Sequence, residues 1–415
     1  MAGTLLIGSA TDACAGFRIS ARVRESLLSQ HIEEEFKWKS ENISCRRTGS
    51  SEESNGNPRH TMNKPVITAK SISHRCQSIC AALAAMVSLF AIEPGARAFA
   101  PADADTIFSA YTGAFYFTNA AGGFFHATTD GGKTWFWERA EQMEMVLDVY
   151  ERTTNAACLT IFSNVFKGFL ADHGTNWQRN EFNDDIMWMV IACARAHLLT
   201  GNKNFQDVAK LNFDMCYARA ASTNLGGGLW WKTANLSKNA CVNGPAAIAA
   251  FLLFQISGDT NYLAKARAIY QWERDMLFDS RSGQIYDSIN HRGEINSRSF
   301  TYNQGTFIGA ANFLGFTNDA KLAADFTKDR LCQDGILPGY PPAGDAGGFN
   351  GICARWVARF MKDRGLQASY QKWLQANAAA AWKMHRTDDN LSWFRWSQPT
   401  PDGPLNSWAA VVQWS

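Results

Sequence analysis

From residue 101 onward, segments that are apolar on every face alternate with segments that carry a single apolar stripe. The first kind includes residues 184–199, 241–257 and 301–316. The second kind includes residues 202–220, where the stripe runs through Phe205, Val208, Leu211 and Met215. A helix that is apolar all round is buried, whereas a helix with one apolar stripe covers the outside of a core. The pattern therefore predicts inner and outer helices in alternation.

About twelve helical segments lie between residues 101 and 415, from residues 103–120 at the start to residues 404–414 at the end, and few segments have a strand pattern. Alternating inner and outer helices form two concentric layers, so the chain is predicted to be all-α, an (α/α)6 barrel of six inner and six outer helices. An open helical solenoid is the alternative, because arrays of helix pairs have similar repeat lengths. Solenoid repeats usually resemble one another in sequence. Here only the hydrophobic pattern repeats, which favours the barrel.

In such a barrel the inner helices run in the same direction, so the residues that open them meet at one end. In each predicted inner helix these residues are mainly polar or aromatic. They are Trp137 and Glu141, Asp184 and Asp185, Lys238, Asn239 and Asn243, Tyr302, Asn303 and Gln304, Phe349 and Asn350, and Asn406. Helix capping explains any one of these groups alone, but six of them at the same end predict a polar cup.

Asp184 and Asp185 stand side by side where the buried segment 184–199 begins, directly after Asn183. Capping is one explanation, because carboxylates in the first turn accept backbone N–H bonds and suit the helix dipole. One cap is enough, however, and two adjacent buried carboxylates repel each other, so one stays ionised while the other tends to keep a proton. Glycoside hydrolysis needs that division between a nucleophile or base and an acid. We therefore predict that Asp184 and Asp185 are catalytic.

The residues around the predicted cup are of types that bind sugars. Aromatic faces can stack on sugar rings, and amide, phenol and ammonium groups can hydrogen-bond to hydroxyls. Core packing is the alternative role for the tryptophans, and capping is the alternative for the amides. The predicted substrate-binding residues are Asn183, Trp137, Trp188, Trp230, Trp231, Lys238, Asn239, Asn243, Tyr302, Asn303 and Gln304.

Several segments, taken in this order, resemble glycoside hydrolase family 76, the endo-α-1,6-mannanases and their relatives. They are "FNDDIMW", "GGGLWWKT", "SKNACVNG", "SGDTNYLAKARAIYQW", "IYDSI" and "TYNQGTFIGAANFL". The resemblance covers about residues 135–361 and implies an (α/α)6 fold and retaining cleavage of α-1,6-linked mannose backbones. It also implies that Asp184 is the nucleophile and Asp185 the acid/base. Met189 departs from the family pattern, where a second aromatic residue is expected after Trp188.

The chain before the predicted barrel has two parts. Residues 1–61 are polar with almost no apolar periodicity, which predicts a disordered or non-native extension. In residues 62–100, basic residues precede an apolar stretch at 79–92, and Ala-Phe-Ala at 98–100 has the form of a cleavage site. A membrane anchor is the alternative, but about 14 apolar residues are few for a stable span. We expect a signal peptide, a catalytic domain over residues 101–415, and secreted or periplasmic localisation.

Charge and composition limit the classes of ligand that the protein is expected to bind. The formal net charge of +2 provides no strongly basic surface for nucleic acid. Histidines are scattered and no Cys-x-x-Cys follows the leader, so we expect no metal and no cofactor. The expected partner is an uncharged polysaccharide or oligosaccharide, α-mannan by the family resemblance, bound by a monomer. A glycan-remodelling transglycosylase, an inverting glycosidase and a non-catalytic glycan-binding barrel are the alternatives.

Overall fold

The computed structural model describes residues 99–341 and 345–410, which belong to a unit that spans residues 92–415. The extension predicted for residues 1–61 lies outside the described residues. So does the signal peptide predicted for residues 62–100, apart from its last two residues. The described residues form eleven α-helices, joined by loops and seven short strands.

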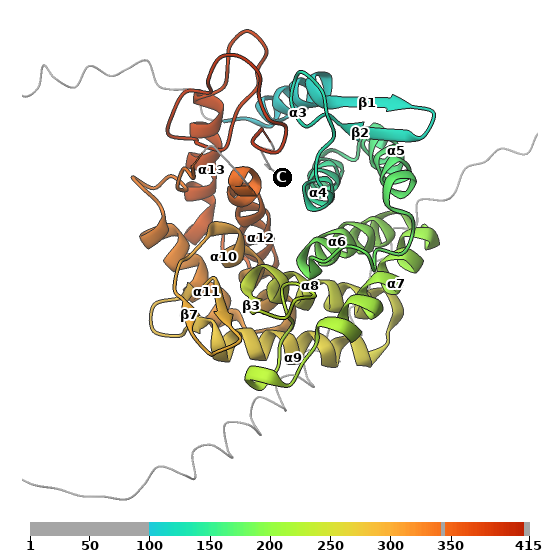
Figure 1. Cartoon of the computed structure of the whole chain (residues 1–415). Coiled ribbons are helices and arrows are strands. Elements are labelled where there is room, and N and C mark those ends of the chain that lie inside the picture. The colour runs from blue at the N-terminus through green and yellow to red at the C-terminus, as the bar shows by residue number, and fades with distance from the viewer. Residues whose placement is uncertain (1–98, 342–344, 411–415) are drawn as a thin grey trace, which may run out of the picture. The chain divides into compact units, whose positions relative to one another are not determined.

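Five inner helices form a ring in which each contacts the next. They are α4 (Phe136–Thr153), α6 (Asn183–Thr200), α8 (Ala240–Ser257), α10 (Thr301–Leu314) and α12 (Phe349–Arg364). An outer helix follows each of them and packs against it, as Figure 1 shows. The outer helices are α3 (Pro101–Phe115), α5 (Ala156–His173), α7 (Lys203–Ala220), α9 (Thr260–Met276), α11 (Thr317–Phe326) and α13 (Gln367–Lys383). The predicted fold class, an all-α (α/α)6 barrel, is confirmed.

The sixth inner position lies between α12 and α4, where the chain returns after α13. The side chain of Asn406 accepts the backbone N–H of Trp408 at 2.7 Å, which starts a turn. The ring of Trp408 lies 4.5 Å from the ring of Trp137 on α4. The helix predicted for residues 404–414 is thus represented by turns up to residue 410, and its remaining residues lie outside the described part.

The first predicted helix, residues 103–120, was too long. The helix ends at Phe115 because Tyr116–Asn119 (β1) pairs with Gly122–Phe125 (β2) in an antiparallel hairpin. The hairpin lies directly on α5, where a Cβ atom added to Gly168 would come within 2.2 Å of the hairpin backbone. The other strands are β3 (Ser237–Asn239), β6 (Ser288–Asn290) and β7 (Ile295–Asn296) in one sheet, and β4 (Phe278–Asp279) with β5 (Gln284–Ile285) in another.

The stripe predicted for the outer helix α7 was partly wrong. Phe205 and Val208 are buried as expected, but Leu211 is 44% exposed. The next residue, Asn212, faces inward instead, where its side chain accepts the N–H of Trp177 at 2.8 Å. A polar side chain can take a buried position when its hydrogen bonds are satisfied there, which the apolar pattern alone cannot show.

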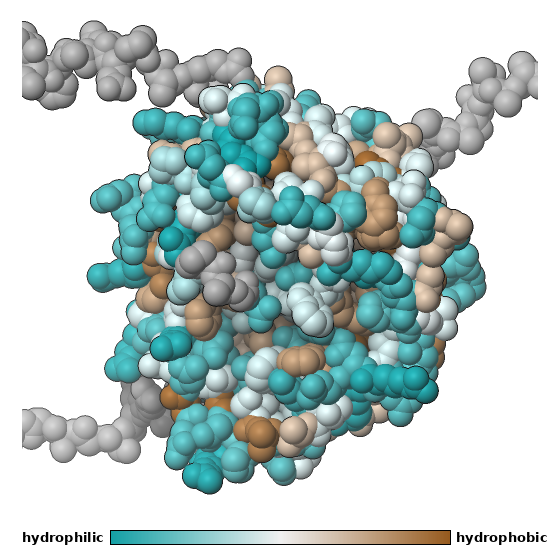
Figure 2. All heavy atoms as spheres, turned by 45° about the horizontal axis from the view of Figure 1, so that its top comes forward, coloured by the Kyte–Doolittle hydropathy of each residue, from teal (hydrophilic) through white to brown (hydrophobic). Residues whose placement is uncertain are grey.

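The inner helix α8 has the length and hydropathy of a membrane span, yet 72% of that segment is buried within the described structure. This burial is typical of a core helix. On the face drawn in Figure 2, hydrophilic residues predominate and apolar residues are scattered between them.

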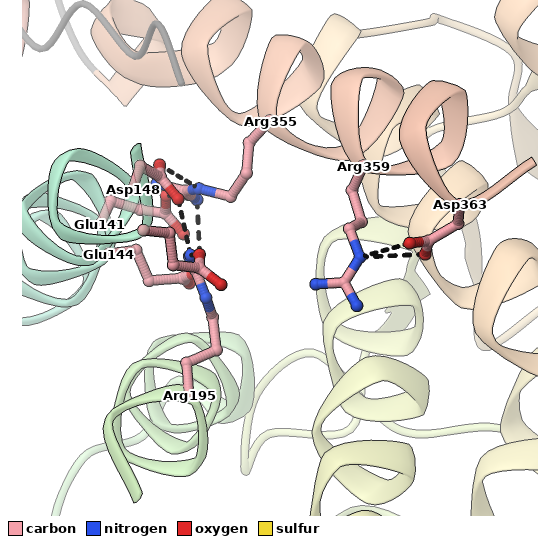
Figure 3. Close-up of polar contacts among 8 residues, drawn as sticks. Glu141, Glu144, Asp148, Arg195, Arg355, Arg359 and Asp363 are labelled. Atoms are coloured by element: carbon pink, nitrogen blue, oxygen red, sulfur yellow. Dashed lines mark hydrogen bonds and ion pairs between the residues drawn. The ribbon is translucent and has the colours of Figure 1, made fainter. Parts of the chain in front are cut away.

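A buried network of charges joins α4, α6 and α12 inside the ring (Figure 3). Arg355 of α12 donates to Asp148 and Glu141 of α4, each at 2.7 Å. Arg195 of α6 donates to Glu144 at 2.8 Å and to Asp148 at 2.7 Å. Buried charges are stable only when they are paired, so this network fixes the helices that flank the sixth position. Glu141 was predicted to face the cup, but it pairs with Arg355 below it.

Candidate active site

The first turn of α6 is fixed by the backbone of the adjacent tryptophan pair. The N–H of Asn183 donates to the carbonyl of Trp231, and the side-chain amide donates to the carbonyl of Trp230, both at 2.8 Å. The side-chain oxygen of Asn183 accepts a bond from Arg219 of α7 at 2.7 Å. Asn183 is 1% exposed and both polar atoms of its side chain are engaged, so it has a structural role rather than the predicted contact with substrate.

Arg219 also organises the loop that precedes α6. Its guanidinium donates to the carbonyls of Gln178 at 2.8 Å and Asn180 at 2.7 Å. The side-chain amide of Asn180 in turn donates to Oδ2 of Asp185 at 2.9 Å. One arginine on an outer helix therefore supports the segments that carry both aspartates.

Asp184 is held through one of its two oxygens. Oδ2 accepts a bond from the indole Nε1 of Trp231 at 2.9 Å and another from the thiol of Cys241 at 3.4 Å. Oδ1 is buried and has no hydrogen-bond partner among the described residues. Trp231 was predicted to stack on a sugar ring. Its ring is partly exposed, but the contact that the structure shows is the bond to Asp184.

The two aspartates differ in their proton affinities. Burial raises the pKa of Asp184 to about 6, although the bonds from Trp231 and Cys241 oppose this rise. Burial, and then the charge of Asp184, raise the pKa of Asp185 to about 8, against the opposing bond from Asn180. Between these pH values Asp184 is ionised and Asp185 is protonated, which is the arrangement that a nucleophile and a general acid require.

A third carboxyl group lies at the same end of the barrel. Glu138 of α4 accepts the N–H of Trp135 at 2.8 Å, and burial raises the pKa of Glu138 to about 7. Both Asp345 and Glu138 act on Asp185 through their charges and help to raise its pKa. The charge of the site therefore changes over the neutral pH range through Glu138 as well as through Asp184 and Asp185.

Aromatic rings from four inner helices meet beside the aspartates. Trp137 of α4 and Tyr302 of α10 lie near the ring of Trp188 on α6, with centroids 6.3 and 6.4 Å apart. Tyr302 stacks on Phe349 of α12 at 3.9 Å. Trp188 is only 1% exposed, so it supports Trp137 and Tyr302, whose rings are partly exposed. The starts of the inner helices do meet at one end.

Lys238 was predicted to bind sugar hydroxyls, and its contacts give it another role. Its ammonium group donates to the carbonyls of Ser222 at 3.2 Å, Asn224 at 2.6 Å and Gly227. The side chain is buried, and this burial lowers the pKa of Lys238 to about 8. All three donors of Lys238 are used to hold the glycine-rich turn.

Two predicted substrate-binding amides are also engaged within the protein. The amide of Asn243 bonds to both the N–H and the carbonyl of Leu229. The amide of Gln304 accepts the N–H of Ile285 and donates to the carbonyl of Gly283 at 3.0 Å. Both side chains are completely buried, so they hold the loops around the cup and do not face it.

The remaining predicted residues differ in their surroundings. Trp230 is 5% exposed and packs under the ammonium group of Lys238 at 4.7 Å, so it belongs to the core. The amide nitrogen of Asn303 donates to Asp287 at 3.3 Å, whereas its buried oxygen has no partner among the described residues. Asn239 is 8% exposed and lies at the first residue before α8.

Sequence reasoning missed four residues that contact Asp184, Asp185 or another predicted site residue. Asp287 lies in "IYDSI", which contributed to the family resemblance, so that motif could have indicated it. Asn180 lies in the polar loop just before α6 and could have been suspected from its position. Cys241 lies in "SKNACVNG", another segment of the family resemblance, whereas Arg219 lies within a helical pattern and no local signal distinguishes it from a surface residue.

Within residues 99–341 and 345–410, no group of three His, Cys, Asp or Glu residues is arranged to hold a metal ion. The six cysteines in these ranges are free thiols, and five of them are buried.

Comparison with known proteins agrees with this geometry. Residues 100–414 match Glycosyl hydrolase family 76. No curated protein matches the chain. The α-1,6-mannanase GH76A from Salegentibacter sp. HEL1_6 has 30% identity and a TM-score of 0.69, and the match covers 74% of this chain and 95% of that one.

A variant of that mannanase is similar to the same extent, with 30% identity, a TM-score of 0.69 and coverage of 74% and 95% of the two chains. Two neighbouring aspartates are replaced by asparagine in this inactive variant, which holds α-1,6-mannotriose. Dfg5 from Chaetomium thermophilum, in complex with glucosamine, has 17% identity over 71% of this chain and 81% of its own, with a TM-score of 0.61. That likeness shows a shared fold. The family match spans most of the chain and includes both aspartates, so the chain belongs to glycosyl hydrolase family 76 and is a glycoside hydrolase.

Proposed function

We propose that the chain is a retaining hydrolase of α-1,6-mannosidic bonds in mannan or related glycans. Asp184 is the nucleophile and Asp185 is the general acid and base. The observation that carries the proposal is the asymmetry of the pair: Asp184 is held by Trp231 and Cys241, whereas Asp185 is held by Asn180. Burial and the charge of Asp184 raise the pKa of Asp185 to about 8, above the pKa of about 6 of Asp184, as these two roles require.

The mechanism follows from these protonation states. Asp185 gives its proton to the glycosidic oxygen while the bond from that oxygen to the anomeric carbon breaks. A carboxylate oxygen of Asp184 forms a bond to the same carbon and gives a glycosyl-enzyme. Asp185, now ionised, takes a proton from water, whose oxygen replaces Asp184 at the anomeric carbon. Two inversions at the same carbon retain its configuration.

Two further features support a mannan substrate. The Salegentibacter α-1,6-mannanase is similar over 74% of this chain, and its inactive form with two neighbouring aspartates replaced holds α-1,6-mannotriose. The partly exposed side chains of Trp137 and Tyr302 lie next to Trp188, one turn after Asp184 on α6, where their rings can stack on sugar rings. The hydroxyl groups of a neutral sugar need no charged partner, and this agrees with the small formal net charge of the chain, +2.

The test is product analysis on linear α-1,6-mannan with the wild type, Asp184→Asn and Asp185→Asn. Asp207→Asn is the matched control, because Asp207 makes an exposed pair with Lys203 on the outer helix α7. Each catalytic variant is expected to lose on the order of a hundredfold or more in rate. The control is expected to keep full activity. Proton NMR early in the reaction is expected to show the α-configured product.

Other outcomes would redirect the proposal. A β-configured first product would mean inversion and a water molecule between the carboxyl groups. Products longer than a starting oligosaccharide would mean transglycosylation. Full activity of Asp184→Asn, or binding of mannan with no turnover by the wild type, would reject the catalytic assignment.

We also propose that the protein acts outside the cytoplasm as a monomer. The proposal for secretion rests on the sequence pattern of residues 62–100. Mass spectrometry of the N-terminus of the expressed protein tests it, and a mature chain that still contains residues 62–100 would contradict it. Light scattering of the purified protein tests the monomer.

A further inference from the structure

Asp184 is bound in a way that makes its two oxygens unequal. Trp231 and Cys241 both donate to Oδ2, at 2.9 and 3.4 Å, whereas Oδ1 has no partner among the described residues. The hydroxyl of Tyr302 is hydrogen-bonded to the thiol of Cys241 in turn. Two elements therefore converge on one carboxylate oxygen, the loop before β3 and the first turn of α8, and the first turn of α10 supports the second of them.

We infer that Trp231 and Cys241 are positioning residues that fix Oδ2 of Asp184 and so hold its carboxylate in one orientation toward the anomeric carbon. This inference rests on the proposed function, because it takes Asp184 as the nucleophile. Tyr302 orients the thiol of Cys241 within the same arrangement. None of these three residues exchanges a proton with the substrate.

Both donors are held in place before any substrate binds. The carbonyl of Trp231 accepts the N–H of Asn183 at 2.8 Å, and the N–H of Trp231 donates to the carbonyl of Ser237 at 2.9 Å. The backbone of Trp231 is therefore tied to the start of α6, one residue from Asp184. Cys241 is 5% exposed and lies in the first turn of the buried helix α8. A preorganised donor aimed at a charged oxygen needs no rearrangement during the reaction.

The thiol of Cys241 and the hydroxyl of Tyr302 remain protonated over the neutral pH range. Burial raises the pKa of the Cys241 thiol and of the Tyr302 hydroxyl well above their ordinary values. Cys241 is therefore a neutral thiol that donates a bond, and not a thiolate that would repel Asp184. The titratable groups that face Asp184 are Asp185 on α6, Cys216 on α7, Cys241 on α8 and Tyr302 on α10.

The chemical consequence appears in both steps of the reaction. In the first step a carboxylate oxygen of Asp184 forms a bond to the anomeric carbon, the glycosidic bond breaks, and its electron pair takes the proton of Asp185. In the second step the oxygen of water bonds to that carbon, the bond from the carbon to Asp184 breaks, and its electron pair returns to Asp184. Asp185 takes the proton of the water. The donors on Oδ2 stabilise the carboxylate that leaves in this second step, so their loss is expected to slow it.

The experiment compares Cys241→Ala, Cys241→Ser and Trp231→Phe with the wild type on a linear α-1,6-manno-oligosaccharide. Cys193→Ala is the matched control, because Cys193 is also a completely buried thiol on an inner helix but lies away from the first turn. We measure kcat, KM and the pH dependence of kcat/KM, and we check folding by thermal unfolding. The serine variant keeps a donor at the position of the thiol.

We expect Cys241→Ala and Trp231→Phe to lower kcat by roughly tenfold to a hundredfold with little change in KM. Loss of either donor removes an effect that lowers the pKa of Asp184, so the acid limb of the pH profile is expected to move upward. Cys241→Ser is expected to recover most of the loss, and Cys193→Ala is expected to keep the wild-type profile.

An unchanged kcat and acid limb in both Cys241→Ala and Trp231→Phe would overturn the inference while the proposed function still stood. A serine variant as impaired as the alanine variant, with both folded, would assign Cys241 to packing and also overturn it. An inactive wild type would reject the proposed function, and the inference would fall with it.

Discussion

Replacement of Arg355 by methionine tests whether the buried charges of Figure 3 hold the inner ring together. Arg355 is 6% exposed and donates at 2.7 Å to Asp148, which is 3% exposed, and to Glu141, which is completely buried. Methionine keeps most of the alkyl packing but removes the charge. Glu144 and Asp148 would retain Arg195 as a partner, so the same carboxylates would share one buried positive charge instead of two.

Removal of one partner from a buried charge pair costs about 3–5 kcal/mol, because the opposite charge stays buried without compensation. In a domain of roughly 300 residues each kcal/mol lowers the melting temperature by roughly 1.5 °C. We therefore expect Arg355→Met to unfold roughly 5–8 °C below the wild type. The effect should be smaller in the double variant Arg355→Met/Asp148→Asn, which also removes one of the buried carboxylates.

The assay is thermal unfolding followed by intrinsic tryptophan fluorescence, with Arg359→Met as the matched control. Arg359 lies one turn further along α12, has a side chain that is 46% exposed, and pairs with Asp363 at 2.9 Å. An exposed pair of this kind contributes roughly 0.3–0.5 kcal/mol, so the control should differ little from the wild type. If Arg355→Met melted within the range of the Arg359→Met control, the reasoning about the network would be refuted.

Other predictions concern the acid groups and the turn. The pH dependence of kcat/KM is expected to be bell-shaped, with limbs near the pKa values of about 6 for Asp184 and about 8 for Asp185, and a rate profile without these limbs would contradict the assignment. Asn180→Ala removes a donor to ionised Asp185, so the pKa of Asp185 and the basic limb are expected to rise; a basic limb that stayed in place would be the contrary result. The pKa of Asp185 is about 8 in the fold but near 4 when unfolded, so stability falls as pH rises between these values. Asp185→Asn should therefore have a free energy of unfolding higher than that of the wild type near pH 9, by on the order of 1–3 kcal/mol. Near pH 4 the two proteins should be about equally stable, and thermal unfolding at both pH values checks this. Lys238→Met leaves three carbonyls without their shared donor, so limited proteolysis should cut the turn at Gly227 faster than in the wild type.

Much of the fold could be predicted because inner and outer helices differ in how apolar residues are distributed around the helix, and this distribution can be read from the sequence. A helix such as α8, apolar on all faces, can only be buried, and its outer neighbour α9 carries charges on one side. The errors arose where tertiary contacts decided the outcome. Residues 116–120 form a hairpin because the glycine backbone at Gly168 allows close approach, and this cannot be read from residues 116–120 themselves.

The candidate site was predictable in its centre and less so in its surroundings. Asp184 and Asp185 stand out because adjacent carboxylates at the start of a buried helix are hard to explain as caps alone. The roles of the polar residues near them were harder to predict, because a buried amide or ammonium group can bind either the ligand or the backbone. Asn243 and Lys238 serve the backbone, and only the positions of the loops that they contact reveal this.

Arg219 limits how independently the two aspartates can be altered. Its single guanidinium binds Asn183, which precedes Asp184, and the loop carbonyl of Asn180, whose side chain binds Asp185. A substitution in α7 near its end would therefore shift Asp184 and Asp185 together. Separate control of the two groups has to be sought on opposite sides of the pair, in the donors to Oδ2 of Asp184 or in the amide that binds Asp185.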